Sequence, residues 1–247
     1  MQPIYRKNFT INDAYVDCFG RLKPSMALFF AQEVAGQHCL ELGADWDTLA
    51  KKNLFWAVIR HRVQFTRLPR SGETITVETW PMPTTRVAYP RSVVALDADG
   101  KECFRSVSLW VLMDTQSRAM VLPGKSGVTV NGLLRGSELA SPNSLMPKAQ
   151  AHSRSCYVNY SHLDRNGHMN NTRYMDWVDD LLPSSFHKEH PVKEFTVCYV
   201  SEARENQRID LDFEMLEGGI FQVDAHREKT DVPGKTERVF SAQVLFE

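Results

Sequence analysis

The order of hydrophobic and polar positions predicts one group of elements twice along the chain. The first copy opens with an alternating stretch at residues 4–11, typical of a strand, followed by an apolar run from Met26 to Leu42. That run starts after Pro24-Ser25, ends at Gly43 and repeats its apolar residues at helical spacing, so it predicts a helix. Because little polar face is left on it, we expect the helix to be buried. A short polar helix at 45–52 and four strands follow, at residues 55–66, 74–80, 87–96 and 103–113.

The second copy repeats this order. A strand at 153–159 and a loop at 161–168 precede a helix at 170–182, which Pro183 ends. Four strands then follow, at residues 194–201, 208–216, 221–228 and 238–246. The copies align by eye, with Asp17-Cys18-Phe19-Gly20-Arg21 on Asp164-Arg165-Asn166-Gly167-His168. Self-similarity at this distance indicates a repeated structural unit.

Each copy combines a long antiparallel sheet with one apolar helix, and a sheet wrapped around its helix buries that surface. This is the hotdog arrangement, so the fold class expected is α+β, a tandem or double hotdog. A ferredoxin-like order fits less well, because each copy has only one long helix. We expect an N-terminal hotdog at residues 1–135, a linker at 136–150 rich in Ser, Asn and Pro, and a C-terminal hotdog at 151–247.

Composition narrows the class of protein. The chain has 247 residues, of which 43% are hydrophobic and 24% charged, which is typical of a folded globular protein. No run approaches the roughly 18 apolar residues of a membrane helix, and the first residues have no signal-peptide pattern, so no membrane association is expected. The five cysteines are odd in number and form no C-x-x-C pair, which favours free thiols in a reducing compartment.

Charge divides unevenly along the chain. Residues 1–135 hold 17 Lys and Arg against 12 Asp and Glu, whereas residues 136–247 hold 12 against 18. A basic half is consistent with an acidic partner or substrate, and equally with an uneven scatter of solvated charges. Nucleic acid is not expected as a partner, because the chain has no dense basic stripe and no recognition motif.

Only the second copy has a polar cluster before its helix. Asp164, Asn166 and His168 alternate in an extended loop, so their side chains are expected to point the same way. The positions that correspond in the first copy hold Asp17, Phe19 and Arg21. Such a cluster suits hydrolysis, since His168 can shuttle a proton and N–H groups at a helix start can bind an oxyanion. The alternative is an Asx-turn with a helix cap, which uses the same residue types.

Other motifs are weak. Gly124-Lys125-Ser126 resembles the end of a P-loop, but Ala119 stands where that motif needs Gly and Pro123 interrupts it. No residue spacing matches a zinc site, so neither a metal nor a cofactor is expected. Trp56, Trp80 and Trp110 lie in predicted strands, where core packing is favoured over ligand contact.

The sequence resembles the acyl-ACP thioesterases, both the plant type and its bacterial relatives. Residues 164–171, Asp-Arg-Asn-Gly-His-Met-Asn-Asn, with Tyr174 and Trp177 after them, resemble the active-site loop and helix of the family. The stretches at 55–60, 67–73, 79–80 and 108–114 resemble strands and a turn of the first half. The resemblance covers nearly the whole chain, and the Asp-x-Asn-x-His-x-Asn-Asn string is its most specific part.

The resemblance implies a double hotdog that hydrolyses fatty acyl thioesters of acyl carrier protein, without a cofactor. It implies catalytic roles for Asp164, Asn166 and His168, and for Glu202, which follows Tyr199-Val200-Ser201 as in the family. Plant members have Cys after this Glu, and Ala203 here implies attack by water instead of a thiol. The plant transit peptide is not seen, which implies a bacterial cytoplasmic protein.

In the implied mechanism, Glu202 is the general base for a water held by Asn166, while Asp164 and His168 bind and polarise the thioester carbonyl. The sequence leaves open whether Asp164 or Glu202 activates the water. The resemblance also places the acyl chain in the first hotdog, with Met26, Phe29, Phe30, Val34 and Trp56 as its expected contacts. The expected contacts of the acidic carrier protein are Arg60, Arg67, Arg70, Arg86 and Arg91, unless these form an ordinary basic surface.

Two rival functions remain at this stage. A hotdog acyl-CoA thioesterase would share the chemistry but recognise nucleotide phosphates in place of a folded acidic protein. A non-enzymatic acyl-binding module would have no reason to keep Asp164, Asn166, His168 and Glu202 together, so it ranks third. Monomer and homodimer both satisfy the sequence, because two fused hotdogs already form the usual pair.

Overall fold

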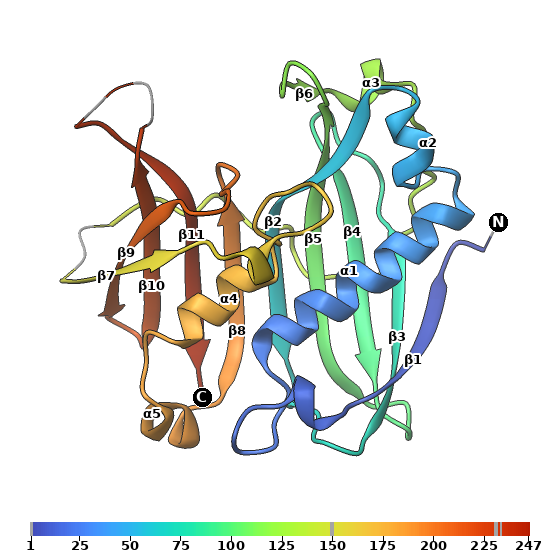
Figure 1. The fold of residues 1–247 in the computed structure, drawn as a ribbon. Coiled ribbons are helices and arrows are strands. Elements are labelled where there is room, and N and C mark those ends of the chain that lie inside the picture. Colours follow the sequence, from blue (N-terminus) through green and yellow to red (C-terminus); the bar gives the residue numbers. More distant parts are fainter. Residues whose placement is uncertain (1, 149–150, 230–231, 233) are drawn as a thin grey trace. The chain divides into compact units, whose positions relative to one another are not determined.

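The chain forms two compact units, Met1–Pro142 and Asn143–Glu247, here called unit 1 and unit 2. The computed structural model describes residues 2–148, 151–229, 232 and 234–247. Each unit combines an antiparallel sheet with helices (Figure 1), as the repeated pattern predicts. Among the described residues, no helix is both long and apolar enough to span a membrane.

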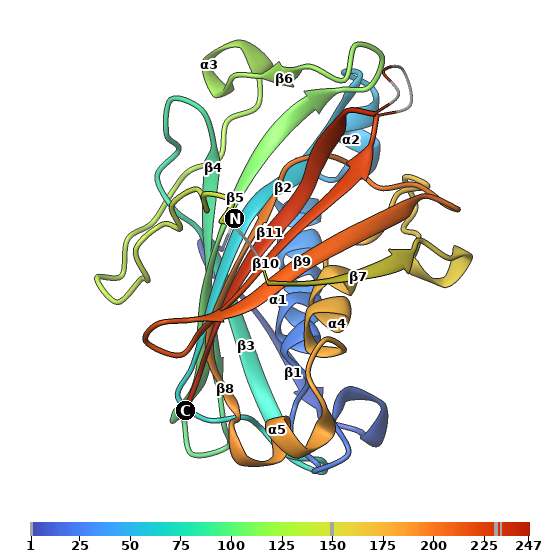
Figure 2. The ribbon, with the colours of Figure 1, turned by 90° about the vertical axis from the view of Figure 1, so that its left-hand side faces the viewer.

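Unit 1 is built on a five-stranded antiparallel sheet of order β1-β3-β4-β5-β2. Helix α1 crosses one face of this sheet in Figure 1, and the turned view of Figure 2 shows it on one side of the strands. The elements are β1 Tyr5–Thr10, a 3₁₀ turn Asp13–Tyr15, α1 Pro24–Glu41, α2 Trp46–Ala50, β2 Leu54–Phe65, β3 Thr74–Pro81, β4 Tyr89–Leu96, β5 Glu102–Asp114, β6 Met120–Val121 and α3 Pro123–Ser126.

Helix α1 starts at Pro24, which fits a first helical position because its missing N–H has no intrahelical partner there. The face toward the sheet buries Leu28, Phe30, Ala31 and Val34, among others. The sequence pattern suggests a helix that is apolar and buried all round. In the structure, however, one stripe of α1 faces outward. On that stripe Phe29 is 39% exposed and Leu40 is 61% exposed.

Unit 2 has the sheet order β8-β11-β10-β9-β7, again antiparallel. The ring of Tyr174 on α4 packs against Phe240 at 4.8 Å and Tyr199 at 5.5 Å, which seats the helix on the sheet. The elements are β7 His152–Tyr157, a 3₁₀ turn Tyr160–His162, α4 Arg173–Asp179, α5 Ser184–Glu189, β8 Val192–Tyr199, β9 Arg208–Leu216, β10 Ile220–Glu228 and β11 Thr236–Phe246.

The helix of unit 2 is shorter than the predicted 170–182. The side chain of Asn170 accepts hydrogen bonds from Thr172 N at 3.0 Å and from Thr172 Oγ1 at 2.9 Å. Such local side-chain bonds compete with helix geometry, so residues 170–172 form a turn and α4 begins at Arg173. After Pro183 the chain makes a second short helix, α5, which the pattern does not predict.

The stretch after α3 in unit 1 packs along the sheet, although its composition is typical of a loose linker. Leu133 N donates to Pro81 O at 2.8 Å, at the end of β3. Glu138 accepts from Trp80 Nε1 at 3.1 Å, and Arg135 forms an ion pair with Glu78 at 2.7 Å. Trp80 itself is buried, which confirms the core role predicted for it.

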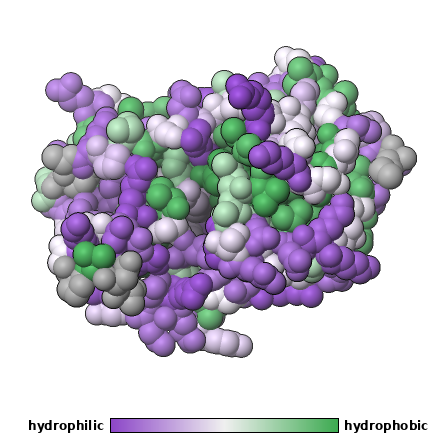
Figure 3. Space-filling view, turned by 90° about the horizontal axis from the view of Figure 1, so that it is seen from above, coloured by the Kyte–Doolittle hydropathy of each residue, from purple (hydrophilic) through white to green (hydrophobic). Residues whose placement is uncertain are grey.

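The surface mixes hydrophilic and hydrophobic residues when seen from above (Figure 3). Met120 of β6 and Leu122, which precedes α3, are exposed apolar side chains of unit 1. Single exposed apolar residues are ordinary on a folded protein, so they indicate no site by themselves.

We expect Gly132→Ala to detach this packed stretch from β3. A Cβ at residue 132 would lie 2.3 Å from Pro83 N and 2.4 Å from the carbonyl carbon of Met82, both backbone atoms that cannot rotate away. Overpacking of this kind costs roughly 1–3 kcal/mol, so the melting temperature should fall by several degrees. Gly124→Ala is the control, because a Cβ there meets nothing within 4 Å and the melting temperature should hold or rise slightly.

Candidate active site

The loop before α4 in unit 2 is organised by the carboxylate of Asp164. Its Oδ1 accepts from Asn166 N at 2.8 Å and from His168 N at 3.4 Å, and its Oδ2 accepts from Asn166 Nδ2 at 3.3 Å. Gly167 turns the loop at φ +73°, a conformation that favours glycine. The Asx-turn alternative is therefore real, and it holds Asn166 and His168 in place.

The same loop exists in unit 1 with different side chains. Asp17 Oδ1 accepts from Phe19 N at 2.8 Å and from Arg21 N at 2.9 Å, and Gly20 has φ +72°. The guanidinium of Arg21 closes back on Asp17, with Nη2 3.0 Å from Oδ2. The structure thus confirms the alignment of the two copies at this loop.

A main-chain hydrogen bond ties the loop of unit 2 to the segment that follows β8. Met169 N donates to Ala203 O at 2.8 Å, and His168 forms an isolated bridge with Arg204. This contact brings His168 Nε2 to 3.3 Å from Glu202 Oε2. The side chain of His168 is 13% exposed and that of Glu202 is 38% exposed, so the carboxylate remains accessible to water.

The matching segments of unit 1 meet in the same way without an acid–base pair. Leu22 N donates to Pro69 O at 2.8 Å, the counterpart of the bond from Met169 to Ala203. In that register Leu68 takes the place of Glu202, and Arg21 takes the place of His168. The imidazole–carboxylate pair is therefore a property of unit 2.

Arg227 on β10 anchors the Glu202 segment, and sequence reasoning missed it. Its Nη1 donates to Glu202 O and to Gln207 Oε1, each at 2.6 Å, and its Nε donates to Glu237 Oε1 at 2.7 Å. Nothing in the local pattern around residue 227 marks this role, because the partners come from other parts of the chain. Arg227 restrains the backbone from which the Glu202 side chain projects.

The helix start is not the open set of oxyanion donors that the sequence suggests. Helix α4 begins at Arg173, and Thr172 N is already bonded to Asn170 Oδ1. Arg173 N likewise donates to Asn170 O at 3.0 Å. These two N–H groups are therefore committed within the loop.

The expected acyl contacts of unit 1 lie at different depths. Phe30 and Val34 are buried on α1, whereas Met26 is half-buried and Phe29 sits on the exposed stripe. Trp56 on β2 donates from Nε1 to Ala44 O at 2.8 Å. Its ring packs edge-on against Tyr89 at 4.9 Å, so it is also part of the packing of the sheet.

The prediction that Arg91 contacts a carrier protein is wrong. Arg91 is 6% exposed, and its Nη1 donates to His38 Nδ1 at 3.1 Å and to Thr79 Oγ1 at 3.2 Å. It belongs to the interior of unit 1 because its strand, β4, buries side chains on both faces of the sheet. A polar pattern cannot tell a solvated arginine from one that finds partners inside.

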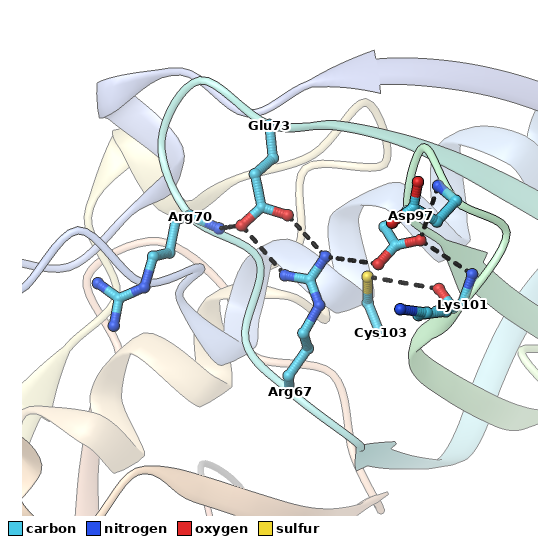
Figure 4. Close-up of polar contacts among 7 residues, drawn as sticks. Arg67, Arg70, Glu73, Asp97, Lys101 and Cys103 are labelled. Carbon is cyan, nitrogen blue, oxygen red and sulfur yellow. Dashed lines mark hydrogen bonds and ion pairs between the residues drawn. The ribbon is translucent and has the colours of Figure 1, made fainter.

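Arg67 is also committed within unit 1 (Figure 4). It donates to both carboxylate oxygens of Glu73, at 3.0 and 2.7 Å, and to Asp97 at 3.1 Å, and these bonds raise its pKa. Arg70 and Arg86 remain exposed, while Arg60 is half-buried and donates to Pro142 O at 3.3 Å. Of the five predicted contacts, Arg70 and Arg86 offer the most accessible positive charge.

The described residues contain no group of three or more His, Cys, Asp or Glu placed to hold a metal ion. All five cysteines are free thiols. Burial raises the pKa of Cys103 to about 11, which keeps that thiol protonated and unreactive at neutral pH.

Comparisons with known proteins match both units. The family model described as the acyl-ACP thioesterase N-terminal domain matches residues 2–122, and that of the acyl-ACP thioesterase C-terminal domain matches residues 145–237. A chloroplastic dodecanoyl-[acyl-carrier-protein] hydrolase of Cinnamomum camphora is 25% identical over 214 residues, covering 81% of this chain and 56% of the relative. The chain thus spans about half the length of the curated relatives it matches.

Solved structures share the fold of the whole chain. An acyl-ACP thioesterase from Bacteroides thetaiotaomicron has a TM-score of 0.88 at 24% identity, covering 99% of this chain and 98% of the other. The 12:0-ACP thioesterase from Umbellularia californica has a TM-score of 0.82 at 22% identity, covering 100% and 98%. These likenesses confirm the predicted tandem hotdog.

We expect Asp164→Ala and Asp17→Ala to destabilise the protein to a similar degree. Each removes a carboxylate that accepts two loop N–H groups, a loss comparable to that of a helix cap, roughly 0.5–2 kcal/mol. Urea-unfolding midpoints of both variants and of the parent would measure this. A cost confined to Asp17→Ala would contradict the holding role that the geometry gives to Asp164.

Proposed function

The chain belongs to the acyl-ACP thioesterase family, and on that premise we propose that it hydrolyses fatty acyl-ACP to free fatty acid and ACP. The observation that carries this proposal is the pair formed by His168 and Glu202, 3.3 Å apart, beside the loop held by Asp164. The corresponding loop of unit 1 has no such pair. Catalysis is therefore assigned to unit 2.

Glu202 is the proposed general base. Both oxygens of Asp164 already accept hydrogen bonds from the loop, so this carboxylate has little capacity left for a water. The side chain of Glu202 is 38% exposed and has His168 beside it. This geometry favours Glu202 over Asp164, an assignment that the sequence leaves open.

In the proposed reaction Glu202 takes a proton from a water molecule while the oxygen of that water attacks the thioester carbonyl carbon. Asn166, held by Asp164, orients that water or the carbonyl oxygen. The bond from carbon to sulfur then breaks, and the sulfur leaves as a thiolate that accepts a proton. His168 steadies the carboxylate of Glu202 and can pass that proton on to the departing sulfur.

Unit 1 is proposed to hold the acyl group. In its loop Arg21 forms an ion pair with Asp17, so this loop has no imidazole–carboxylate pair for catalysis. The proposed acyl contacts are those predicted from the sequence, Met26, Phe29, Phe30, Val34 and Trp56. The free thiols fit a reducing compartment and support a cytoplasmic location, whereas curated relatives such as that of Cinnamomum camphora are named as chloroplastic.

We expect Glu202→Gln to lower kcat for acyl-ACP by about 100-fold or more, because the amide cannot accept the proton from water. Thiol release from purified protein with acyl-ACP and acyl-CoA of 8 to 18 carbons would measure it. Glu205→Gln is the matched control, an exposed glutamate three residues further on, and should retain turnover.

The variant Asp164→Asn separates the two carboxylates, since the amide oxygen still accepts from the loop N–H groups. It should cost less than Glu202→Gln. Loss of turnover in Asp164→Asn with retention in Glu202→Gln would exchange the two roles. Absence of turnover with every acyl-ACP and acyl-CoA would overturn the proposed function as a whole.

We expect Arg86→Glu to raise the KM for acyl-ACP by about 3- to 10-fold and to leave kcat unchanged, because an exposed charge acts on association with an acidic partner. The effect should weaken as salt is added. Acyl-CoA of the same chain length is the control substrate. Equal effects on both substrates would count against a carrier-protein contact at this residue.

A further inference from the structure

Polar side chains cross the middle of the sheet of unit 1 on the side that faces α1. In the strand register His61 lies opposite Ser108, and Ser108 lies opposite Arg91 on the other side. Residues directly opposite in antiparallel strands point to the same face. Arg91 reaches His38 of α1 at 3.1 Å, so all three side chains point toward the helix.

The next register row continues this polar band. Ser106 lies opposite Val93, which in turn lies opposite Thr79. Ser106 Oγ is 3.1 Å from His61 Nε2, and Thr79 accepts from Arg91. His61, Arg91, Ser106, Ser108 and Thr79 are here called the polar band, and all five are buried.

The rows on both sides of the polar band are apolar or aromatic. On one side Phe65, Phe104 and Ala95 lie in register, and on the other Tyr89 lies opposite Trp110. Burial of polar groups costs free energy unless each finds a hydrogen-bond partner. A hydrocarbon chain forms no hydrogen bonds, so its binding alone does not explain polar groups in this interior.

One buried polar atom of the polar band lacks a partner among the residues that the structure describes. It is Nδ1 of His61, a side chain only 2% exposed. The strand register turns His61 toward α1, so this nitrogen belongs to the interior between α1 and the sheet.

The chemistry of His61 Nδ1 selects a ligand group. Burial lowers the pKa of His61 to about 3, so the ring is neutral and its Nδ1 either donates or accepts, according to the tautomer. A hydroxyl group can pair with Nδ1 in either tautomer, a carbonyl oxygen can pair only with a protonated Nδ1, and a plain methylene chain pairs with neither.

We propose that unit 1 contains a binding site for a hydroxyl group carried by the acyl chain, with His61 Nδ1 as its hydrogen-bond partner. This proposal rests on the proposed function, in which unit 1 holds the acyl group. It assigns the enzyme a substrate class, hydroxyacyl thioesters, in preference to unsubstituted ones. An unsubstituted chain would leave His61 Nδ1 unpaired when it fills this interior.

The test compares dodecanoyl-ACP with a set of hydroxydodecanoyl-ACP isomers that differ in the position of the hydroxyl group. For at least one isomer we expect kcat/KM to exceed that of the unsubstituted chain by about 10-fold or more, since a buried polar group left unpaired is costly. His61→Leu should remove most of this preference by raising turnover of the unsubstituted chain. Ser92→Ala, a buried serine of β4 on the other face of the sheet, should keep the preference.

Binding of free dodecanoate and of the matching hydroxydodecanoates, measured by calorimetry, separates this proposal from the proposed function. Tighter binding of a hydroxy acid that His61→Leu abolishes would support the site even if no acyl-ACP were hydrolysed. Equal binding and equal turnover of all isomers and the unsubstituted chain would overturn it. So would a hydroxyl preference that survives in His61→Leu.

Discussion

One main-chain hydrogen bond, from Met169 N to Ala203 O, fastens the loop before α4 to the end of the segment after β8. Everything proposed for catalysis depends on it, because the two partners flank His168 and Glu202. Residues 34 positions apart in the chain are brought to 3.3 Å by this contact. Arg227 on β10 reinforces this contact by donating to the carbonyl oxygen of Glu202.

The two units share the backbone form of the loop but differ in the side chains that the loop carries. Asp17 and Asp164 hold loops of the same form, and the bond from Leu22 to Pro69 repeats the bond from Met169 to Ala203. On this shared frame, leucine and arginine in unit 1 replace the glutamate and histidine of unit 2. Phe19 likewise stands where unit 2 has Asn166, so the two loops differ in side chains on a shared backbone frame.

The order of elements could be predicted because alternation and helical spacing are local properties of the chain. The extent of the second helix could not, since the side-chain bonds of Asn170 decide where α4 begins. The loop residues Asp164, Asn166 and His168 stand out in the sequence, but Glu202 came only from a family resemblance. Its contact with His168 depends on tertiary structure. Arg91 was misplaced because its partners, His38 and Thr79, lie on elements far away in the sequence.

Only one of the two repeated loops carries an imidazole–carboxylate pair. The bonds that fasten the His168 loop to the Glu202 segment, and the bond from Arg227 to Glu202 O, lie within unit 2. In the proposed function, the unit that sets the rate is therefore not the unit that holds the acyl group. A new acyl preference then needs substitutions beneath α1 alone, with the proposed reaction centre of unit 2 kept as it is.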